Sequence, residues 1–194
     1  MNVVSLFSGI GGLDQGFLEA GFDVIWANDF DKYAAKTYCI NFPNSMMNLG
    51  DINKIPLGSI PQHDILIGGF PCQPFSMMGD QKGFEDTRGT LFFRVAEIIN
   101  YQIENNKAPK AIVLENVRRL LTHDKSNTFK TIKRVLENLG YKVFYSVLNS
   151  ADYGVPQTRN RLFIVCFRDQ DVNFTFPKPQ MLTVSDRDIL QKNV

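Results

Sequence analysis

The segment that decides the fold reads Ile65-Leu66-Ile67-Gly68-Gly69-Phe70-Pro71-Cys72-Gln73-Pro74-Phe75-Ser76. Its first three residues form an apolar run that predicts a buried strand, and the two glycines after it predict a bend. Each proline fixes its own φ and pushes the preceding residue toward an extended backbone. Cys72 is therefore predicted on a stiff bend at the carboxyl end of a strand, where ligands collect in open α/β sheets. A lone cysteine is more often a small buried hydrophobe, so its role depends on the rest of the chain.

On both sides of this bend, short apolar runs alternate with segments of helical periodicity, which is typical of βα-repeating folds. The sequence therefore predicts a doubly wound α/β fold with a mostly parallel sheet and helices on both faces. Strands are expected at residues 3–7, 24–27, 46–49, 65–67, 111–114, 142–148 and 162–167. Helices are expected at residues 13–20, 31–41, 91–99, 129–139 and 183–192.

Length and composition restrict the classes of protein that the chain can represent. The 194 residues suffice for one domain with a small appendage, and 44% hydrophobic with 21% charged residues favours a folded protein. Three cysteines without a CxxC spacing argue against a disulfide framework or a zinc site. The apolar runs are too short to span a bilayer, and the start lacks the basic region of a signal peptide, so we expect a cytoplasmic protein. The net charge of +1 gives no support for nucleic-acid binding, so any basic surface must be local.

The first three predicted strands end in residues suited to a nucleoside. Ser8-Gly9-Ile10-Gly11-Gly12 is a glycine-rich turn that allows close approach of a ligand to the backbone and to a helix N-terminus. Asp29 follows the second strand, where a carboxylate can accept both ribose hydroxyls, and Phe30 can pack on adenine. Asp51 follows the third strand and can accept from the adenine amino group. Each aspartate alone could equally cap a helix or lie in a solvated loop, but together they predict an adenosine-containing ligand.

Several motifs occur in a fixed order along the chain. They are Phe7-Ser8-Gly9-Ile10-Gly11-Gly12, Gly69-Phe70-Pro71-Cys72-Gln73-Pro74-Phe75-Ser76, Arg88-Gly89-Thr90-Leu91-Phe92, Glu115-Asn116-Val117 and Gln157-Thr158-Arg159-Asn160-Arg161. Through these motifs the chain resembles the cytosine-C5 DNA methyltransferase family over residues 7–167. The resemblance implies a Rossmann-like methyltransferase fold with an antiparallel last strand. It also implies S-adenosylmethionine as cofactor, no metal, double-stranded DNA as substrate, and a restriction-modification role in a bacterium or phage.

The resemblance also assigns a role to each motif residue. Cys72 is the expected nucleophile, Glu115 the acid that contacts N3 and the exocyclic amine of cytosine, and Arg161 the ligand of O2. Arg159 shares that role or contacts phosphate, and Asn116 orients the cysteine loop. A surface salt bridge is the ordinary alternative for both arginines. The expected cofactor contacts are Phe7, Ser8, Gly9, Ile10, Gly11, Gly12, Asp29, Phe30, Asp51, Ile52, Pro71 and Leu91.

The loop at residues 76–89 is longer than an ordinary βα connection, which favours a functional lid. The resemblance implies that this loop closes over a cytosine that is flipped out of the duplex. Its candidate DNA contacts are Gln81, Lys82 and Arg88. An ordinary solvated loop is the alternative.

In the family, a target-recognition region follows the motif at residues 157–161, and this chain stops about where that region would begin. We therefore expect a catalytic domain at residues 1–176 and a linker at 177–194, and the missing region belongs either to a longer chain or to a second polypeptide. The sequence leaves three other functions open. The chain could methylate transfer RNA, act as an inactive cofactor-binding partner, or be a nicotinamide-dependent oxidoreductase of the same fold class.

Overall fold

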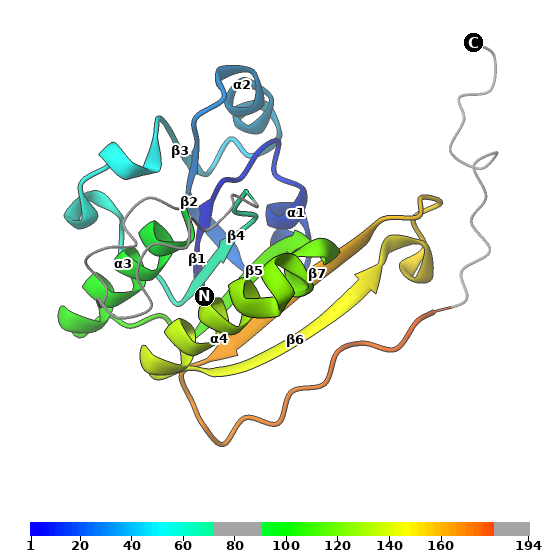
Figure 1. Ribbon diagram of the computed structural model, residues 1–194. Coiled ribbons are helices and arrows are strands. Elements are labelled where there is room, and N and C mark those ends of the chain that lie inside the picture. The colour runs from blue at the N-terminus through cyan, green and yellow to red at the C-terminus, as the bar shows by residue number, and fades with distance from the viewer. Residues whose placement is uncertain (72–90, 181–194) are drawn as a thin grey trace, which may run out of the picture.

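A computed structural model describes residues 1–71 and 91–180 (Figure 1). In this part of the chain seven strands form one sheet in the order β3-β2-β1-β4-β5-β7-β6. The strands are β1 (Asn2–Leu6), β2 (Asp23–Asp29), β3 (Met46–Leu49), β4 (Ile65–Gly68), β5 (Ala111–Val117), β6 (Lys142–Asn149) and β7 (Asn160–Phe167). The helices are α1 (Gly12–Glu19), α2 (Lys32–Asn41), α3 (Leu91–Glu104) and α4 (Asn127–Asn138), with short 3-10 turns η1 (Ile52–Lys54), η2 (Leu57–Ser59), η3 (Arg118–Leu121), η4 (His123–Ser126) and η5 (Ser150–Tyr153).

The strand directions confirm the predicted sheet. Strands β1 to β5 are mutually parallel where they pair, whereas β7, the last strand in sequence, runs antiparallel to both β5 and β6. All four residues of β4 are buried, as is usual for a central parallel strand that is covered on both faces. The apolar run at residues 65–67 therefore lies at the centre of the sheet, as its composition predicts.

Helices cover both faces of the sheet. On one face α3 and α4 pack against the alternate residues Val4, Leu6, Leu66, Ile112 and Leu114 in the largest apolar cluster. On the other face α1 packs over Val3, Ile65 and Ile67, and α2 contributes Tyr38 against Ala27. This is the doubly wound arrangement expected from the sequence, and it leaves the carboxyl edge of the parallel strands free for a site.

Two of the helices are followed by glycines in the left-handed conformation. Gly21 and Gly140 follow α1 and α4 with φ of +83° and +86°, the left-handed conformation in which a residue with a Cβ is strained. The predicted helix at residues 183–192 lies outside the described residues.

After β7 the chain returns along β6 toward the end at which β6 finishes (Figure 1). We call residues 168–180 the strap. The Lys142 ammonium donates to the carbonyls of Gln170 and Val172, at 2.9 and 3.0 Å. The Phe174 ring packs against two rings of the sheet, Phe144 and Phe167.

The far end of the strap is tied to η5. The Tyr153 hydroxyl donates to the Pro177 carbonyl at 2.9 Å, and the Gln180 amide donates to the Asp152 carbonyl at 2.8 Å. The first residues of the predicted linker therefore pack on the domain. They also bring the chain back to the edge of the sheet where the parallel strands end.

None of the helices in the described ranges is both long and apolar enough to cross a lipid bilayer.

Candidate active site

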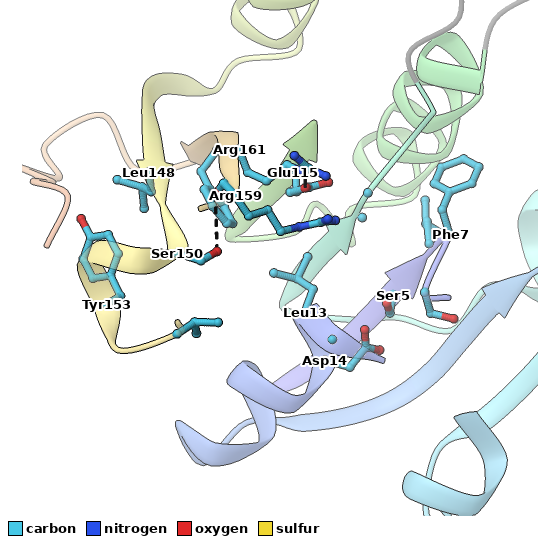
Figure 2. Close-up of a pocket in the computed structure, with 17 residues that line it drawn as sticks. Ser5, Phe7, Leu13, Asp14, Glu115, Leu148, Ser150, Tyr153, Arg159 and Arg161 are labelled. Carbon is cyan, nitrogen blue, oxygen red and sulfur yellow. Dashed lines mark hydrogen bonds and ion pairs between the residues drawn. The ribbon is translucent and has the colours of Figure 1, made fainter. Parts of the chain in front are cut away.

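A cavity of about 550 Å³ lies at the carboxyl edge of the sheet (Figure 2). Its wall combines the end of β1 and the start of α1 with the ends of β4 and β5, the start of β7, and the η5 segment. Segments that lie far apart in the sequence therefore meet there. The lining residues are Ser5, Leu6, Phe7, Ser8, Gly12, Leu13, Asp14, Gly68, Gly69, Glu115, Leu148, Ser150, Tyr153, Val155, Arg159, Arg161 and Phe163.

An ion pair between Glu115 and Arg161 forms one side of this cavity (Figure 2). In the antiparallel β5–β7 ladder Arg161 lies opposite Val117, two residues beyond Glu115, so both side chains emerge on the same face. The Arg161 Nε is 2.8 Å from Glu115 Oε1, and the two side chains are 23% and 25% exposed. The pair thus holds a carboxylate and a guanidinium in fixed orientations while both still face solvent.

The backbone on the approach to Cys72 is held close to this pair. A Cβ on Gly69 would lie only 3.3 Å from Glu115 Oε2, so a larger residue would crowd the carboxylate. Asn116 is 3% exposed, and its Nδ2 donates to the Phe70 carbonyl at 2.7 Å. The structure therefore fixes the bend up to Pro71 beside Glu115. Cys72 itself lies outside the described residues, so its position and role stay a prediction.

We expect Asn116→Ala to lower the free energy of unfolding by about 1–3 kcal/mol, because it leaves the buried Phe70 carbonyl without its donor. Urea unfolding measures the change. Asn138→Ala, at an exposed asparagine at the end of α4, is the matched control and should change stability by less than about 0.5 kcal/mol. Equal stability of the Asn116 variant and the wild type would show that the side chain does not hold the bend.

The glycine-rich turn is tied to β2 through Asp29. The Gly9 amide donates to Asp29 Oδ2 and the Asp31 amide donates to Asp29 Oδ1, each at 2.8 Å. A carboxylate oxygen has two acceptor positions, so each can still accept a ribose hydroxyl as predicted from the sequence. The structure thus adds a second task for Asp29, that of shaping the turn, and leaves the cofactor contact a prediction.

Phe7 adopts an unusual backbone conformation at the start of this turn. Its φ is +55°, in the left-handed region that costs a residue with a Cβ roughly 1–2 kcal/mol. The Ser8 amide donates to the Asn28 carbonyl at 3.0 Å and helps to hold the turn. Such conformations gather at functional sites, and the sequence carries no signal for this one.

Other predicted cofactor residues lie beside the cavity, at the ends of β2 and β3. The Phe30 ring is 77% exposed there, and Asp51 caps η1 by accepting from the Asn53 amide. Asn28, for which the sequence predicts no role, is buried and donates to the carbonyls of Asn48 and Gly50 at 2.9 Å. Asn28 therefore joins the two strand ends that carry Phe30 and Asp51.

The predicted site residues are therefore distributed over two adjoining regions. Phe7, Ser8, Gly12, Glu115, Arg159 and Arg161 line the cavity, and Asn116 lies behind it. Gly9, Ile10 and Gly11 complete the turn, Pro71 is exposed, and Leu91 begins α3. The Ile52 side chain is only 2% exposed and packs in the core, so only its backbone remains available to a cofactor.

A buried carboxyl lies behind the turn, at a position for which the sequence predicts no special role. Asp14 is fully buried in the first turn of α1 and accepts a hydrogen bond from the Tyr38 hydroxyl at 2.8 Å. Burial raises the pKa of Asp14, while the hydrogen bond from Tyr38 opposes that rise. An aspartate in a first helical turn is usually solvated, so the sequence gives no indication that this one would be buried.

The η5 segment, where the sequence predicts only a loop, forms the wall of the cavity opposite α1. Asn149 Oδ1 accepts from the Arg159 amide at 3.0 Å, and the Ser150 amide donates to the Arg159 carbonyl at 3.1 Å. These bonds hold the backbone of Arg159 against η5, and Tyr153 and Val155 reach the cavity beyond it. The only sequence signal is the turn-forming pair Asn149-Ser150.

Comparison with known sequences gives a consistent result. The model of the family described as C-5 cytosine-specific DNA methylase matches residues 1–193. The Type II methyltransferase M.NgoBI of Neisseria gonorrhoeae is 50% identical over 176 residues, which are 91% of this chain and 53% of that protein. M.HhaI of Haemophilus parahaemolyticus is 42% identical over 192 residues, 98% of this chain and 57% of that protein.

Solved structures share the fold. A DNA modification methyltransferase encoded within an Escherichia coli prophage is 27% identical with a TM-score of 0.75, and the match covers 97% of this chain and 53% of that one. The Dnmt2 methyltransferase of S. pombe, 21% identical with a TM-score of 0.72, is matched over 90% of this chain and 51% of its own. The chain spans about half the length of the relatives that it matches.

Proposed function

The chain belongs to the C-5 cytosine-specific DNA methylase family, and on this basis we propose that it transfers a methyl group from S-adenosylmethionine to C5 of a cytosine in double-stranded DNA. The observation that carries this proposal is the Glu115–Arg161 pair, which faces the glycine-rich turn across one cavity. A restriction-modification role is part of the proposal, because its relatives include Type II methyltransferases.

The chemistry requires a nucleophile, because C5 of an aromatic cytosine reacts poorly with an electrophile. Addition of the Cys72 thiolate to C6 forms a carbon–sulfur bond, breaks the aromaticity and makes C5 nucleophilic. When bound, S-adenosylmethionine would supply the electrophilic methyl group for C5, with S-adenosylhomocysteine as the product. A base then removes the C5 proton, and the electrons of that bond expel the thiolate from C6 to release 5-methylcytosine.

The ion pair supplies two of the contacts that this sequence of steps needs. Glu115 contacts N3 and the exocyclic amine. In its protonated form it donates a proton to N3 as the thiolate adds, and it takes this proton back when the thiolate is expelled. Arg161 contacts O2, and its bond to Glu115 orients both groups before the base arrives. Arg159, held by its backbone to Asn149 and Ser150, contacts O2 or a neighbouring phosphate.

The cofactor is proposed to lie along the carboxyl ends of β1 to β3. The amino-acid end faces the turn of Phe7, Ser8 and Gly12 in the cavity. Asp29 accepts from the ribose hydroxyls, and the exposed Phe30 ring packs on adenine. Asp51 accepts from the adenine amino group. The side chains present fit an adenosine cofactor, since carboxylates and an exposed ring gather at this edge.

C5 is inaccessible inside a duplex, so the target base must be flipped out into the cavity. The recognition region that selects this base is proposed to follow the strap or to belong to a second polypeptide. The strap supports this arrangement because its contacts with η5 bring the chain back beside Arg159. The predicted lid at residues 76–89 lies outside the described residues.

We expect saturating S-adenosylhomocysteine to raise the melting temperature by about 5–10 °C, because a ligand at 100 times its Kd adds about 2.7 kcal/mol of stability. NAD should give no shift.

Asp29→Asn should weaken the binding of S-adenosylhomocysteine about 10–100-fold through loss of charge-assisted bonds. Asp23→Asn, at an exposed aspartate at the start of β2, should bind as the wild type does. Calorimetry and thermal unfolding measure both effects.

Stabilisation by NAD alone would contradict the proposal and support an oxidoreductase. Methyl transfer is then compared on duplex DNA and on transfer RNA with the recognition region present, either in a longer chain or in a second polypeptide. Transfer to RNA only would correct the substrate, and binding of S-adenosylhomocysteine without any transfer would favour the inactive partner.

A further inference from the structure

Charged residues are unevenly distributed along the chain, although the net charge is only +1. Residues 1–64, which carry the proposed cofactor site, hold seven Asp or Glu and three Lys or Arg. Residues 107–161 hold eleven Lys or Arg and only four Asp or Glu. The near-neutral composition therefore conceals a basic region on the side of the sheet formed by β5, β6 and β7.

Three cations of this region follow β5 closely in sequence, Arg118 and Arg119 in η3 and Lys125 in η4, and we call them the basic shoulder. All three side chains are exposed. None of them forms an ion pair with another described residue, whereas Lys110 and Lys133 elsewhere in the same region are paired with Asp64 and Glu137. The shoulder thus presents unneutralised positive charge to solvent.

The backbone under the shoulder is anchored rather than loose. Leu120, between the arginines and Lys125, is fully buried in the main apolar cluster. His123 Nδ1 is 2.7 Å from the hydroxyl of Thr128, which is 3% exposed. These two contacts fix η3 and η4 to the core, so the three cations project from a defined surface.

The first residue of the shoulder is close to Glu115, the proposed contact of the target base. Arg118 follows Glu115 by three residues at the end of β5, so their Cα atoms are at most about 10 Å apart. Successive nucleotides of one DNA strand are separated by about 3.4 Å along the helix axis. Cations at this distance from Glu115 can therefore reach phosphates within about three nucleotides of a base that lies against it.

We propose that the basic shoulder binds backbone phosphates of the DNA strand that carries the target cytosine. This inference rests on the proposed function for the identity of the partner. Phosphate contacts position a protein on the duplex and contribute no base preference. The shoulder therefore supplies affinity to this chain that is independent of any recognition region.

The test compares the variant Arg118→Gln/Arg119→Gln/Lys125→Gln with a control of the same charge change, Lys36→Gln/Lys54→Gln/Lys107→Gln. The control lysines are exposed and lie on α2, in η1 and after α3. Binding of a labelled duplex is followed by fluorescence anisotropy between about 50 and about 200 mM salt, a range in which phosphate contacts dominate the salt dependence. The slope of log K against log salt is negative, with about −0.9 for each phosphate contact. We expect this slope to be shallower by about 2–3 in the shoulder variant, because three contacts are removed. We also expect it to bind at least about tenfold more weakly at low salt, and the control to stay near the wild type.

Equal losses in the two variants, or no binding of the duplex by the wild type at low salt, would overturn the proposal. Stronger competition by transfer RNA than by unlabelled duplex would overturn the assignment to DNA. The thermal shift with S-adenosylhomocysteine is measured on the same samples. If S-adenosylhomocysteine raises the melting temperature as expected but the shoulder variant keeps the salt slope of the wild type, only the role of the shoulder is rejected. If S-adenosylhomocysteine does not raise the melting temperature of the wild type, the proposed function is rejected.

Discussion

Cys72→Ser is expected to lower the rate of methyl transfer by about 10⁴- to 10⁶-fold, the range seen when an enzyme loses its nucleophile. A serine hydroxyl is hardly ionised near neutral pH, whereas a thiol with a pKa near 8.5 already supplies some thiolate. Binding of S-adenosylhomocysteine should not change, because the substitution exchanges one side-chain atom and leaves the proposed cofactor contacts, Pro71 included, in place. The loss is measured as transfer of a labelled methyl group to duplex DNA, with the recognition region present in a longer chain or in a second polypeptide.

The control for this variant is Cys39→Ser, at an exposed cysteine on α2. It should retain full activity. A second measurement uses a duplex with 5-fluorocytosine at the target position, since fluorine at C5 cannot be removed as a proton. The wild type should then form a covalent complex that survives denaturation, and Cys72→Ser should form none. Activity of Cys72→Ser near that of the wild type would contradict the assignment of the nucleophile.

Glu115→Gln is expected to lower the rate of methyl transfer by about 10²- to 10⁴-fold, the usual contribution of a general acid. Glutamine can still contact the base but cannot donate a proton to N3 as the thiolate adds. Stability should change by at most about 1 kcal/mol, because the Glu115 and Arg161 side chains are 25% and 23% exposed and solvent screens their interaction. A large loss of rate with a small loss of stability distinguishes a catalytic role from a structural one.

Glu137→Gln is the matched control, because it breaks the partly exposed Lys133–Glu137 pair on α4, away from the cavity. Both variants should have similar midpoints in urea, and only Glu115→Gln should lose activity. A loss of stability in Glu115→Gln that accounts for its loss of activity would show that the pair is structural.

The secondary structure was predictable because it depends on short-range patterns. The apolar run at residues 65–67 forms the buried strand β4, and Gly21 and Gly140 end their helices in the left-handed conformation. The order of motifs along the chain likewise indicates the family without reference to the fold. Each of these signals lies within a few consecutive residues or in their order, so it does not depend on which strands pair.

Other features of the site have no such local signal. The burial of Asp14 depends on Tyr38, which lies 24 residues away on another helix. The η5 segment follows β6 at the edge of the sheet, yet it lines the same cavity as the end of β1, which lies four strands away in the sheet. The left-handed Phe7 and the buried Asn28 likewise depend on contacts between strand ends.

Periodicity and residue identity were therefore enough to predict the class of fold, the order of the motifs and the chemical types of the proposed reacting groups, because both are properties of the chain. Tertiary contacts were needed to show that Glu115 pairs with Arg161, that Asn116 holds the Phe70 carbonyl, and that the side chains of the basic shoulder are exposed. The physical reason is that contacts between distant residues depend on which strands pair. Pairing of β5 with β7 brings Arg161 to Glu115, and pairing of β5 with β4 brings Phe70 to Asn116.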